Sequence, residues 1–321
     1  MKKIQLSATQ TVSKFFYLKY KRLINILTNP ALLKNVITNY FFVIPGLLMF
    51  LIFSIYPFYK ILQLSLFEWN GLPGLMKFVW FRNYIDAFVS REWWISVWNA
   101  GYVTLLALTL QNALALILAL IVDKEIRGKN FYRVVFYLPP VLSGIVVGLV
   151  WDWIYNGNYG LLNHWLSIIG LDNLTRAWLS EPKTALTAVG IIHMWKGFGW
   201  GFIILLAGLQ SIPRELYEAA RVDGAGERMI FLKVTVPLMI PVFFLVSILT
   251  ILGTMQIFDI IVATTRGGPG YHTEVPITRI LAHMTGDLRF GFASSLGFIF
   301  GIILFIVSMM QLKLSKRLKV D

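Results

Sequence analysis

The stretch PRELYEAARVDGAGERMIFLKVTVPLMIP, residues 213–241, is a polar interruption between two long apolar runs. Pro213 suits the first turn of a helix, because its missing N–H would have no partner there. Apolar residues at helical spacing follow it, and the dipeptide Asp223-Gly224 is a stop and turn signal. A second helical run, about 227–235, is expected to end before Pro237, because helix is disfavoured in the residue that precedes a proline. The stretch therefore predicts a helix, a glycine turn and a second helix that project from a membrane.

The spacing of seven residues in this stretch matches a pattern of ABC importer permeases. That pattern is Glu-Ala-Ala, three residues, Gly, nine residues, an aliphatic residue, one residue, an aliphatic residue and Pro. The stretch thus resembles the EAA loop of this family, although Val stands where the family often has Ile and Leu. In the family the loop is a coupling helix that sits in a groove of an ATPase subunit; the alternative is an ordinary cytoplasmic helix hairpin. The matching residues are Glu218, Ala219, Ala220, Gly224, Val234, Val236 and Pro237. The residues to which the resemblance assigns ATPase coupling are Glu218, Ala219, Ala220, Asp223 and Gly224.

The composition of the chain is that of a membrane protein. Hydrophobic residues make up 57% of its 321 residues, and the mean hydropathy is +0.68. A soluble domain of this length could not bury so much apolar surface. There is no cysteine, which excludes a disulfide framework, a thiolate metal site and a cysteine nucleophile. No secretory signal is expected, because the first apolar run starts only near Tyr40.

Several apolar runs exceed the roughly 20 residues that a helix needs to cross a bilayer. We predict six spans. Because six is an even number, both termini are expected on the same side of the membrane. The predicted spans are 40–62, 97–121, 134–155, 185–209, 239–263 and 292–312.

The distribution of positive charge predicts which side the termini occupy. Of the 29 Lys and Arg residues, 19 lie in the two termini and in the two connections on their side, and eight lie in the opposite loops. Short loops rich in Lys and Arg stay in the cytoplasm. Both termini and residues 213–241 are therefore expected to be cytoplasmic. Topology thus accounts for the net charge of +13, and nucleic acid is not an expected partner.

The sequence divides into four parts. Residues 1–38 carry seven Lys and Arg and no acid; we interpret them as a basic cytoplasmic segment, either lying on the anionic membrane face or disordered. Residues 39–93 hold the first span and an outer loop, whose tryptophans fit an aromatic belt at the lipid boundary. Residues 94–313 are expected to form the core transmembrane domain, and residues 314–321 a cytoplasmic tail.

Two further segments resemble the sugar permeases of the same family. The resemblance covers roughly residues 40–312 and implies an all-α, polytopic fold of six transmembrane helices, the type I ABC importer permease fold. The pair Pro139-Pro140 must break or bend the third span. Residues 160–169 are expected to form a short helix on the outer surface. The matching residues are Arg133, Leu138, Pro139, Trp151, Gly160 to Asn163, Phe258, Asp259, Thr264, Gly267, Gly268 and Pro269.

The sequence offers no catalytic centre of its own. It contains no phosphate-binding GxxxxGK[ST] loop, no HExxH motif and no GxSxG motif. If transport uses ATP, the ATPase is another chain, so ATP and Mg²⁺ are expected on partner subunits and no cofactor on this one. The four histidines lie far apart in sequence, which argues against a metal site. We therefore predict no catalytic residue and no metal ligand, and interpret the chain as a pore subunit rather than an enzyme.

Ionisable residues inside membrane spans are functional candidates, because an unpaired charge at mid-bilayer costs about 2.5–3.5 kcal/mol. Lys196 lies about midway along the fourth span. Two interpretations stay open: it pairs with Asp152 or Asp259, or it lines the path and meets a negatively charged substrate. Rings and polar groups at similar depth offer the stacking faces and hydrogen bonds that sugars need. The candidate substrate-path residues are His193, Trp195, Lys196, Trp200, Thr254, Gln256, Asp259, Trp151 and Tyr155.

The resemblance implies both a function and a set of partners. The chain is expected to be a permease subunit of an ATP-driven importer for sugars or oligosaccharides in a bacterial cytoplasmic (inner) membrane. It is expected to assemble with a second homologous permease, two ABC ATPases, an extracytoplasmic solute-binding protein and membrane lipids. Lys196 favours acidic oligosaccharides such as uronate or alginate fragments. Neutral oligosaccharides and glycerol phosphates remain as alternatives.

Two other classes of membrane protein fit the sequence less well. A membrane-embedded enzyme would need a cluster of acids or a His-Asp pair at a membrane boundary, and the sequence suggests neither. A proton-coupled transporter would need several buried carboxylates, and only Asp152 and Asp259 qualify. Co-purification of a partner ATPase would separate these cases.

Overall fold

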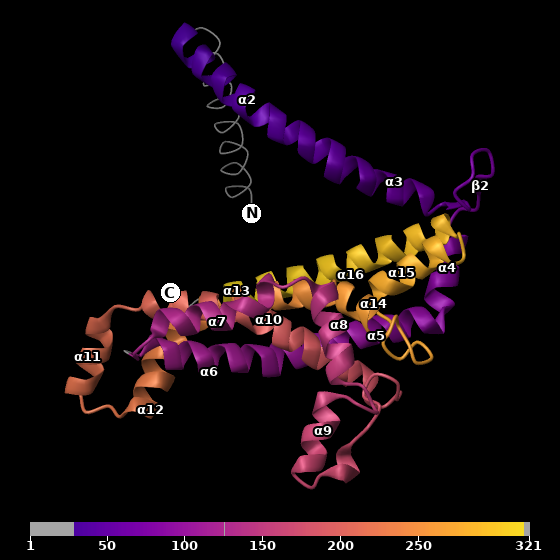
Figure 1. Ribbon diagram of the computed structural model, residues 1–321. Coiled ribbons are helices and arrows are strands. Elements are labelled where there is room, and N and C mark those ends of the chain that lie inside the picture. The colour runs from indigo at the N-terminus through magenta and orange to yellow at the C-terminus, as the bar shows by residue number, and fades with distance from the viewer. Residues whose placement is uncertain (1–28, 125, 318–321) are drawn as a thin grey trace, which may run out of the picture. The chain divides into compact units, whose positions relative to one another are not determined.

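Helices make up most of the computed structural model, which describes residues 29–124 and 126–317 (Figure 1). The chain forms two compact units, Met1–Ile61 and Leu62–Asp321. Most of the basic segment predicted for residues 1–38, and half of the predicted tail, lie outside the described residues.

The described part of the first unit is one apolar helical stretch. Helix α2 (Pro30–Phe50) is followed by a π-helical turn (Leu51–Ile55) and by α3 (Tyr56–Leu64), which continues into the second unit. Within it, Thr38–Leu64 is long and apolar enough to cross a membrane. The prediction of a first span at 40–62 is therefore confirmed as a helix of spanning length.

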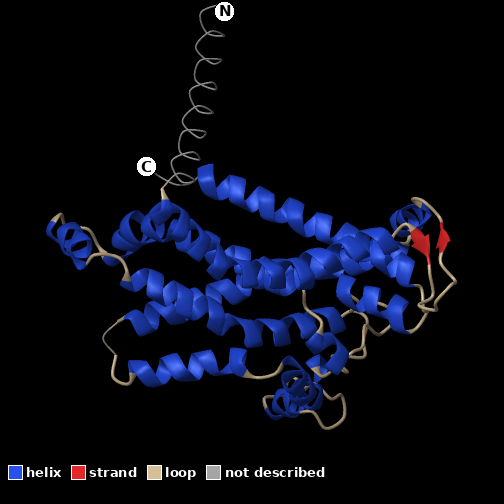
Figure 2. Cartoon of the chain, turned by 90° about the horizontal axis from the view of Figure 1, so that it is seen from above, coloured by secondary structure: helices blue, strands red, loops and turns tan. Residues whose placement is uncertain are grey.

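The second unit is a bundle of helices with one small hairpin of antiparallel strands. The strands β1 (Phe67–Glu68) and β2 (Lys77–Phe78) lie at one end of the bundle (Figure 2). Its helices are α4 (Arg82–Val89), α5 (Arg91–Leu106), α6 (Asn112–Asp123), α7 (Lys129–Val141), α8 (Gly144–Ile154), α9 (Leu161–Ile168), α10 (Ala185–Gln210), α11 (Arg214–Val222), α12 (Glu227–Ile230), α13 (Val236–Met255), α14 (Asp259–Ala263), α15 (Pro276–Thr285) and α16 (Phe290–Arg317). Shorter turns are π-helical at Ala107–Gln111 and Phe231–Thr235 and 3-10 helical at Asp172–Leu174.

The described helices include five stretches that are long and apolar enough to cross a membrane, and a sixth span is the bent pair α7–α8. The prediction of six spans is confirmed when this pair counts as one. The two helices of the pair meet at 94°, and α7 ends at Val141, one residue after Pro139 and Pro140. The predicted break in the third span is therefore confirmed. The short helix expected within 160–169 is α9.

The helix that follows Gly226 does not end before Pro237, and this prediction was wrong. Helix α12 runs through a π turn into α13, which contains Pro237 and Pro241. A proline lacks an N–H, and its ring clashes with the carbonyl four residues earlier in an α-helix. The π turn Phe231–Thr235 shifts the carbonyls before Pro237 out of α-helical register, so the ring is accommodated. The second helix of the hairpin is therefore continuous with the fifth span.

Helix α10 lies at the centre of the bundle, because it packs against α5, α6, α7 and α13. Its buried side chains belong to two separate apolar clusters. Val189 and Ile192 join a cluster with α8 and α14, whereas Phe202 and Leu205 join one with α6 and α13. A third cluster lies between α4, α5 and α16. The fourth span thus connects the two ends of the second unit.

The two ends of the second unit carry different structures. Figure 1 shows α11 and α12 at one end, and the strand β2, α4 and α15 toward the opposite end. The predicted hairpin at 213–241 and the short outer segments are therefore separated by the length of the membrane-spanning helices, as the predicted topology requires.

Candidate functional site

The first candidate site is the hairpin of α11 and α12. α11 begins at Arg214, and Pro213 is its N-cap residue, just before the first turn in which it was expected. It ends at Val222, Asp223 is its C-cap residue, and Gly224 has a φ of 80°, a left-handed conformation that a glycine adopts without strain. No atom lies within 4 Å of where a β-carbon on Gly224 would be, so only its backbone demands glycine. The turn therefore depends on the backbone freedom of Gly224 and not on packing against other residues.

The base of the hairpin is tied to the bundle, and its outer face is open. The Tyr217 hydroxyl lies 3.3 Å from the Thr235 hydroxyl, which is within hydrogen-bonding distance. Ile212 and Ile230, at the two bases, are buried in or beside the core. By contrast, Glu218, Ala219 and Asp223 are exposed, Ala220 is partly exposed, and the Val222 side chain is 87% exposed. An apolar side chain as exposed as that of Val222 on a polar hairpin can form a contact with another protein.

The second candidate site is the set of predicted path residues, and three of its aromatic rings meet. The ring centroids of Trp151 and Tyr155 are 5.1 Å apart, and those of Trp151 and Trp195 are 5.8 Å apart. Trp178, which the sequence analysis missed, joins them at 6.3 Å from Tyr155. Trp178 lies in a loop without any local pattern that could have indicated its place. The four rings form a continuous aromatic surface where α8 approaches α10.

Trp200 does not belong to this aromatic surface. Its ring packs edge-on against Tyr137 of α7, with centroids 5.3 Å apart. Trp195 and Trp200 are five positions apart on one helix, so they point to different sides of α10. The prediction had grouped them because they are close in sequence.

Three ionisable path residues lie on two helices that are in contact. His193 and Lys196 are one turn apart on α10, and α14, which begins at Asp259, packs against α10. Lys196 is partly buried and forms no ion pair with an acid in residues 29–124 and 126–317. Asp152, one of its two predicted partners, is exposed. Within the same residues, no group of three His, Cys, Asp or Glu could hold a metal ion.

Asp259 lies at the break in the third span. Gly144 is the first residue of α8, and a β-carbon on it would overlap the Asp259 carboxylate. Helix α14, which begins at Asp259, packs along α8. The Asp259 Oδ1 accepts from the N–H of Ile260 in its own helix at 2.9 Å. The carboxylate therefore fills the space that the missing side chain of Gly144 leaves at the first residue of α8.

Thr254 belongs to a polar seam between spans. Its hydroxyl is buried and lies 2.8 Å from the Thr104 hydroxyl of α5. The Thr250 hydroxyl, one turn earlier, donates to Asn112 at 3.0 Å. The neighbouring Gln111 is also buried, and its Oε1 has no hydrogen-bond partner among the described residues. Gln256, at the end of α13, is exposed, so Thr254 and Gln256 do not share one surface.

Gln111 and Asn112 were not predicted as functional residues. Two adjacent amides in the apolar run of the second span could have indicated a polar contact there, since polar side chains at membrane depth face other helices or a cavity. The structure assigns Asn112 to the seam. It also places Gln111 beside Gly197, where the missing side chain leaves room for the amide.

A family model and individual relatives both match most of the chain to transport permeases. The family model described as binding-protein-dependent transport system inner membrane component matches residues 111–320. The probable ABC transporter permease protein YurN of Bacillus subtilis is 35% identical over 285 residues, which cover 88% of this chain and 97% of that protein. The trehalose/maltose transport system permease protein MalF of Thermococcus litoralis is 33% identical over 273 residues, covering 85% and 92%.

A solved structure supports the same fold. One chain of a bacterial ABC transporter involved in the import of the acidic polysaccharide alginate matches with a TM-score of 0.77 and 22% identity. The match covers 89% of this chain and 98% of that chain. The predicted type I importer permease fold is thereby confirmed.

The packing at the break predicts a specific effect of one methyl group. In Gly144→Ala, the new β-carbon must displace the Asp259 carboxylate, and overpacking of this kind costs about 1–3 kcal/mol. We expect a lower melting temperature of the purified protein in detergent. Gly253→Ala is the matched control, because a β-carbon on this helical glycine meets no atom within 4 Å. Adding Asp259→Ala to Gly144→Ala should restore part of the loss; equal melting temperatures for Gly144→Ala and Gly253→Ala would contradict the contact.

Proposed function

The chain belongs to the family of binding-protein-dependent transport system inner membrane components, as a permease subunit of a carbohydrate ABC importer, and from this premise we propose how it works. Helix α11 receives the movement of a separate ATPase, and the bundle passes acidic oligosaccharides. The chain is a multi-pass membrane protein and a transport component rather than an enzyme. The hairpin of α11 and α12 is the observation that carries the coupling proposal.

The shape of the hairpin supports a coupling role. Its outer face offers two small residues, Ala219 and Ala220, beside the exposed carboxylate of Glu218 and the exposed Val222. Small side chains let a helix approach a groove closely, and the carboxylate can pair with a basic residue of the partner. Arg221 pairs with Glu227 at 3.3 Å across the turn, which bridges the two helices.

The connection of the hairpin to the bundle supports transmission of force. α11 follows the fourth span after a short turn, and α12 is continuous with the fifth. A displacement of α11 would therefore move two central spans together. ATP and Mg²⁺ would bind to the ATPase pair, whose closed and open states would favour outward-open and inward-open bundles respectively. A second, homologous permease would complete the path.

A contact between α11 and an ATPase fixes the orientation of the chain in the membrane. If α11 meets an ATPase, it lies in the cytoplasm, and the opposite end with β2, α4 and α15 lies outside the cell. Both termini would then be cytoplasmic, in agreement with the excess of Lys and Arg on their side. The bacterial cytoplasmic membrane is the membrane in which such an arrangement would work.

Lys196 supports an acidic substrate. An ammonium group at mid-span that has no ion pair among the described residues must reach water or a ligand, because leaving it in lipid is costly. His193, one turn away, adds a second group that can donate a hydrogen bond. A carboxylate of a uronate unit would complement this pair.

The aromatic surface supports a saccharide rather than a small inorganic anion. The rings of Trp151, Tyr155 and Trp195 offer flat apolar faces for the C–H side of a sugar ring. Neutral oligosaccharides would use these faces without Lys196. Glycerol phosphates would use Lys196 without needing the rings.

The turn of the hairpin generates the first prediction of function. Gly224→Val places a β-branched residue at a φ of 80°, which costs about 1–2 kcal/mol and reorients α11. We expect at least a tenfold loss of substrate-stimulated ATP hydrolysis and uptake in membrane vesicles, with an assembled complex. Gly226→Val is the matched control, because Gly226 has a φ of −71° and equal open space. Uptake equal to wild type in both variants would contradict the coupling role.

The charge of Lys196 generates a prediction of specificity. Lys196→Ala removes a charge-assisted hydrogen bond of about 1.5–3 kcal/mol, so uptake of a uronate trisaccharide should fall about 10- to 100-fold. Uptake of a neutral trisaccharide, where it occurs, should fall much less. Lys183→Ala, at an exposed loop position, should change neither. Equal losses for both sugars would make Lys196 structural, and selective loss of glycerol phosphate uptake would favour that substrate.

A further inference from the structure

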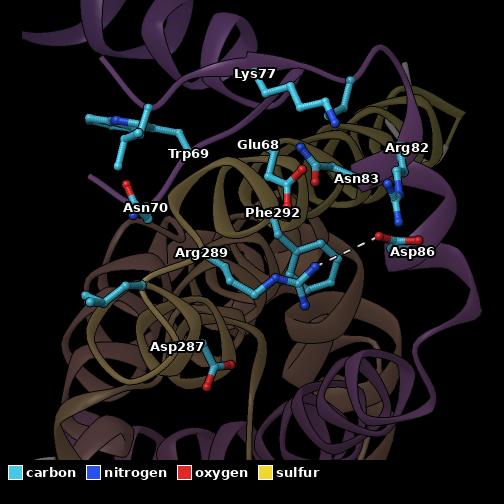
Figure 3. Close-up of a pocket in the computed structure, with 13 residues that line it drawn as sticks. Glu68, Trp69, Asn70, Lys77, Arg82, Asn83, Asp86, Asp287, Arg289 and Phe292 are labelled. Atoms are coloured by element: carbon cyan, nitrogen blue, oxygen red, sulfur yellow. Dashed lines mark ion pairs between the residues drawn. The ribbon is translucent and has the colours of Figure 1, made fainter. Parts of the chain in front are cut away.

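A cavity of about 390 Å³ opens in the second unit, between the β1–β2 hairpin, α4 and the turn that joins α15 to α16 (Figure 3). Its size falls in the range of roughly 300–1,000 Å³ that is usual for small-molecule sites. The proposed coupling helix and the candidate substrate path use none of its residues. Charged side chains dominate the lining, and they are Glu68, Lys77, Arg82, Asp86, Asp287 and Arg289.

The ends of three membrane-spanning stretches place this cavity at the depth of the lipid headgroups. The first stretch ends at Leu64, the second begins at Arg91 and the last begins at Phe290. The lining residue Glu68 follows the first end by four positions, and Arg289 directly precedes the start of the last stretch. The headgroup layer is about 5–7 Å thick on each side of the hydrocarbon. Residues so close to the ends of the spans lie in that layer, so lipid headgroups surround the cavity.

Exposed apolar side chains form a rim beside the cavity. Leu75 and Leu288 line it, and Trp80 and Phe81 directly precede the lining residue Arg82. All four apolar side chains are more than half exposed. Exposed aromatic residues are typical of the boundary between headgroups and hydrocarbon. The rim therefore offers a surface to the glycerol and upper acyl chains of a lipid whose headgroup enters the cavity, which a soluble ligand would not need.

Buried contacts hold the walls of this cavity in place. The Asn83 side chain is only 5% exposed, and its Nδ2 donates to the carbonyls of Ser65 and Phe67 at 2.9 Å each. Gly291, at the start of α16, leaves room for the Phe67 carbonyl, which a β-carbon would overlap. The β1–β2 hairpin is thus fixed against both α4 and α16. The cavity is therefore preformed, which lowers the entropic cost of binding.

The charges of the cavity have both signs and only partly neutralise one another. Arg289 and Asp86 pair at 3.9 Å between Nη2 and Oδ2 (Figure 3). Glu68 lies opposite Lys77 in the hairpin, yet neither of them forms an ion pair among the described residues. Arg82 has no ion pair in that part of the chain either. Two cations and one carboxylate are thus available to a ligand.

Asp287 is a second available carboxylate. His283 Nδ1 donates a 2.6 Å hydrogen bond to it. Burial lowers the pKa of His283, so the imidazole is neutral at pH 7 and does not compensate the Asp287 charge. The Asp287 side chain is 57% exposed, so a ligand can reach it. The available groups are therefore two cations and two carboxylates.

We propose that this cavity binds the headgroup of a zwitterionic phospholipid that carries a primary ammonium group, a phosphoethanolamine. The phosphate binds to Lys77 and Arg82, the ammonium binds to Glu68 and Asp287, and the acyl chains leave along the apolar rim. The depth of the cavity follows from the ends of the spans, whichever end of the bundle faces the cytoplasm. The inference therefore does not rest on the proposed function.

The charges of the lining argue against other occupants. Three cations and three carboxylates leave no excess of positive charge that would attract an anionic headgroup. A choline headgroup has no N–H, whereas a primary ammonium can donate charge-assisted hydrogen bonds to both free carboxylates. Within residues 29–124 and 126–317, no group of three His, Cys, Asp or Glu could hold a metal ion instead.

The test uses the assembled complex, purified in detergent, with native mass spectrometry to measure the dissociation constants of added lipids. We expect the wild type to bind one phosphatidylethanolamine at least tenfold more tightly than phosphatidylcholine or phosphatidylglycerol with the same acyl chains. Arg82→Glu removes a phosphate partner and should weaken this binding about tenfold or more. Glu68→Gln removes an ammonium partner and leaves an excess of positive charge, so it should shift the preference toward phosphatidylglycerol.

Arg91→Glu is the matched control, because this exposed arginine stands at the start of α5, near the same depth, and does not line the cavity. It should keep the wild-type constants, and melting temperatures should show that the variants are folded. If Arg82→Glu does not fold, the change of preference in Glu68→Gln decides alone.

Three results would overturn the inference. They are a wild type without preference for phosphatidylethanolamine, wild-type constants in both test variants, and an equal loss in Arg91→Glu. Free phosphoethanolamine tests the source of the ligand. If it displaced the lipid at equal concentration, the apolar rim would add nothing and the assignment to a lipid would be wrong.

Discussion

The contact between the Asp259 carboxylate and Gly144 is the interaction on which the arrangement of this bundle depends. A broken span is tolerated at membrane depth only where protein or a water-filled cavity surrounds the break. Here α14 brings a carboxylate to the first residue of α8, directly after a 94° bend. With its start fixed, α8 carries Trp151 and Tyr155 toward Trp195 of α10. The geometry of the break and the position of the aromatic surface thus both depend on the packing of α14 against α8.

The same contact connects the two ends of the second unit. The helix that begins at Glu227 runs through the π turn and α13 to Met255, and α14 begins four residues later. A movement of the proposed coupling helix α11 would therefore pass through the turn at Gly224 into the helix that ends at Met255, and from there through α14 to α8. The π turn Phe231–Thr235 is the point where this helix departs from α-helical register, and such turns often occur at functional positions.

Local signals in the sequence predicted local structure well. The turn at Gly224 and the six spans follow from glycine chemistry and apolar length, which need no knowledge of neighbours. The helix end before Pro237 was wrong, because a π turn upstream accommodates a ring that a regular helix would reject. Trp195 and Trp200 pack against different helices, because closeness in sequence does not fix which side of a helix a ring faces; their shared place on a substrate path stays a prediction. The cavity around Arg82 could not be predicted at all, since its walls come from residues about 200 positions apart.

The central claim is that α11 lies in the cytoplasm and contacts a separate ATPase. The chain has no cysteine, so Ala219→Cys places the subunit's single thiol on the exposed face of α11, and Asn173→Cys places one on the exposed segment after α9. The most direct measurement attaches a thiol-directed photocrosslinker to each variant in the assembled complex and tests each thiol in intact cells with a membrane-impermeant maleimide. The account predicts that the thiol at 219 crosslinks to the ATPase and is protected from the maleimide, whereas the thiol at 173 is labelled and does not reach the ATPase. Labelling of the thiol at 219 from outside, or its failure to crosslink to any other subunit, would contradict the account.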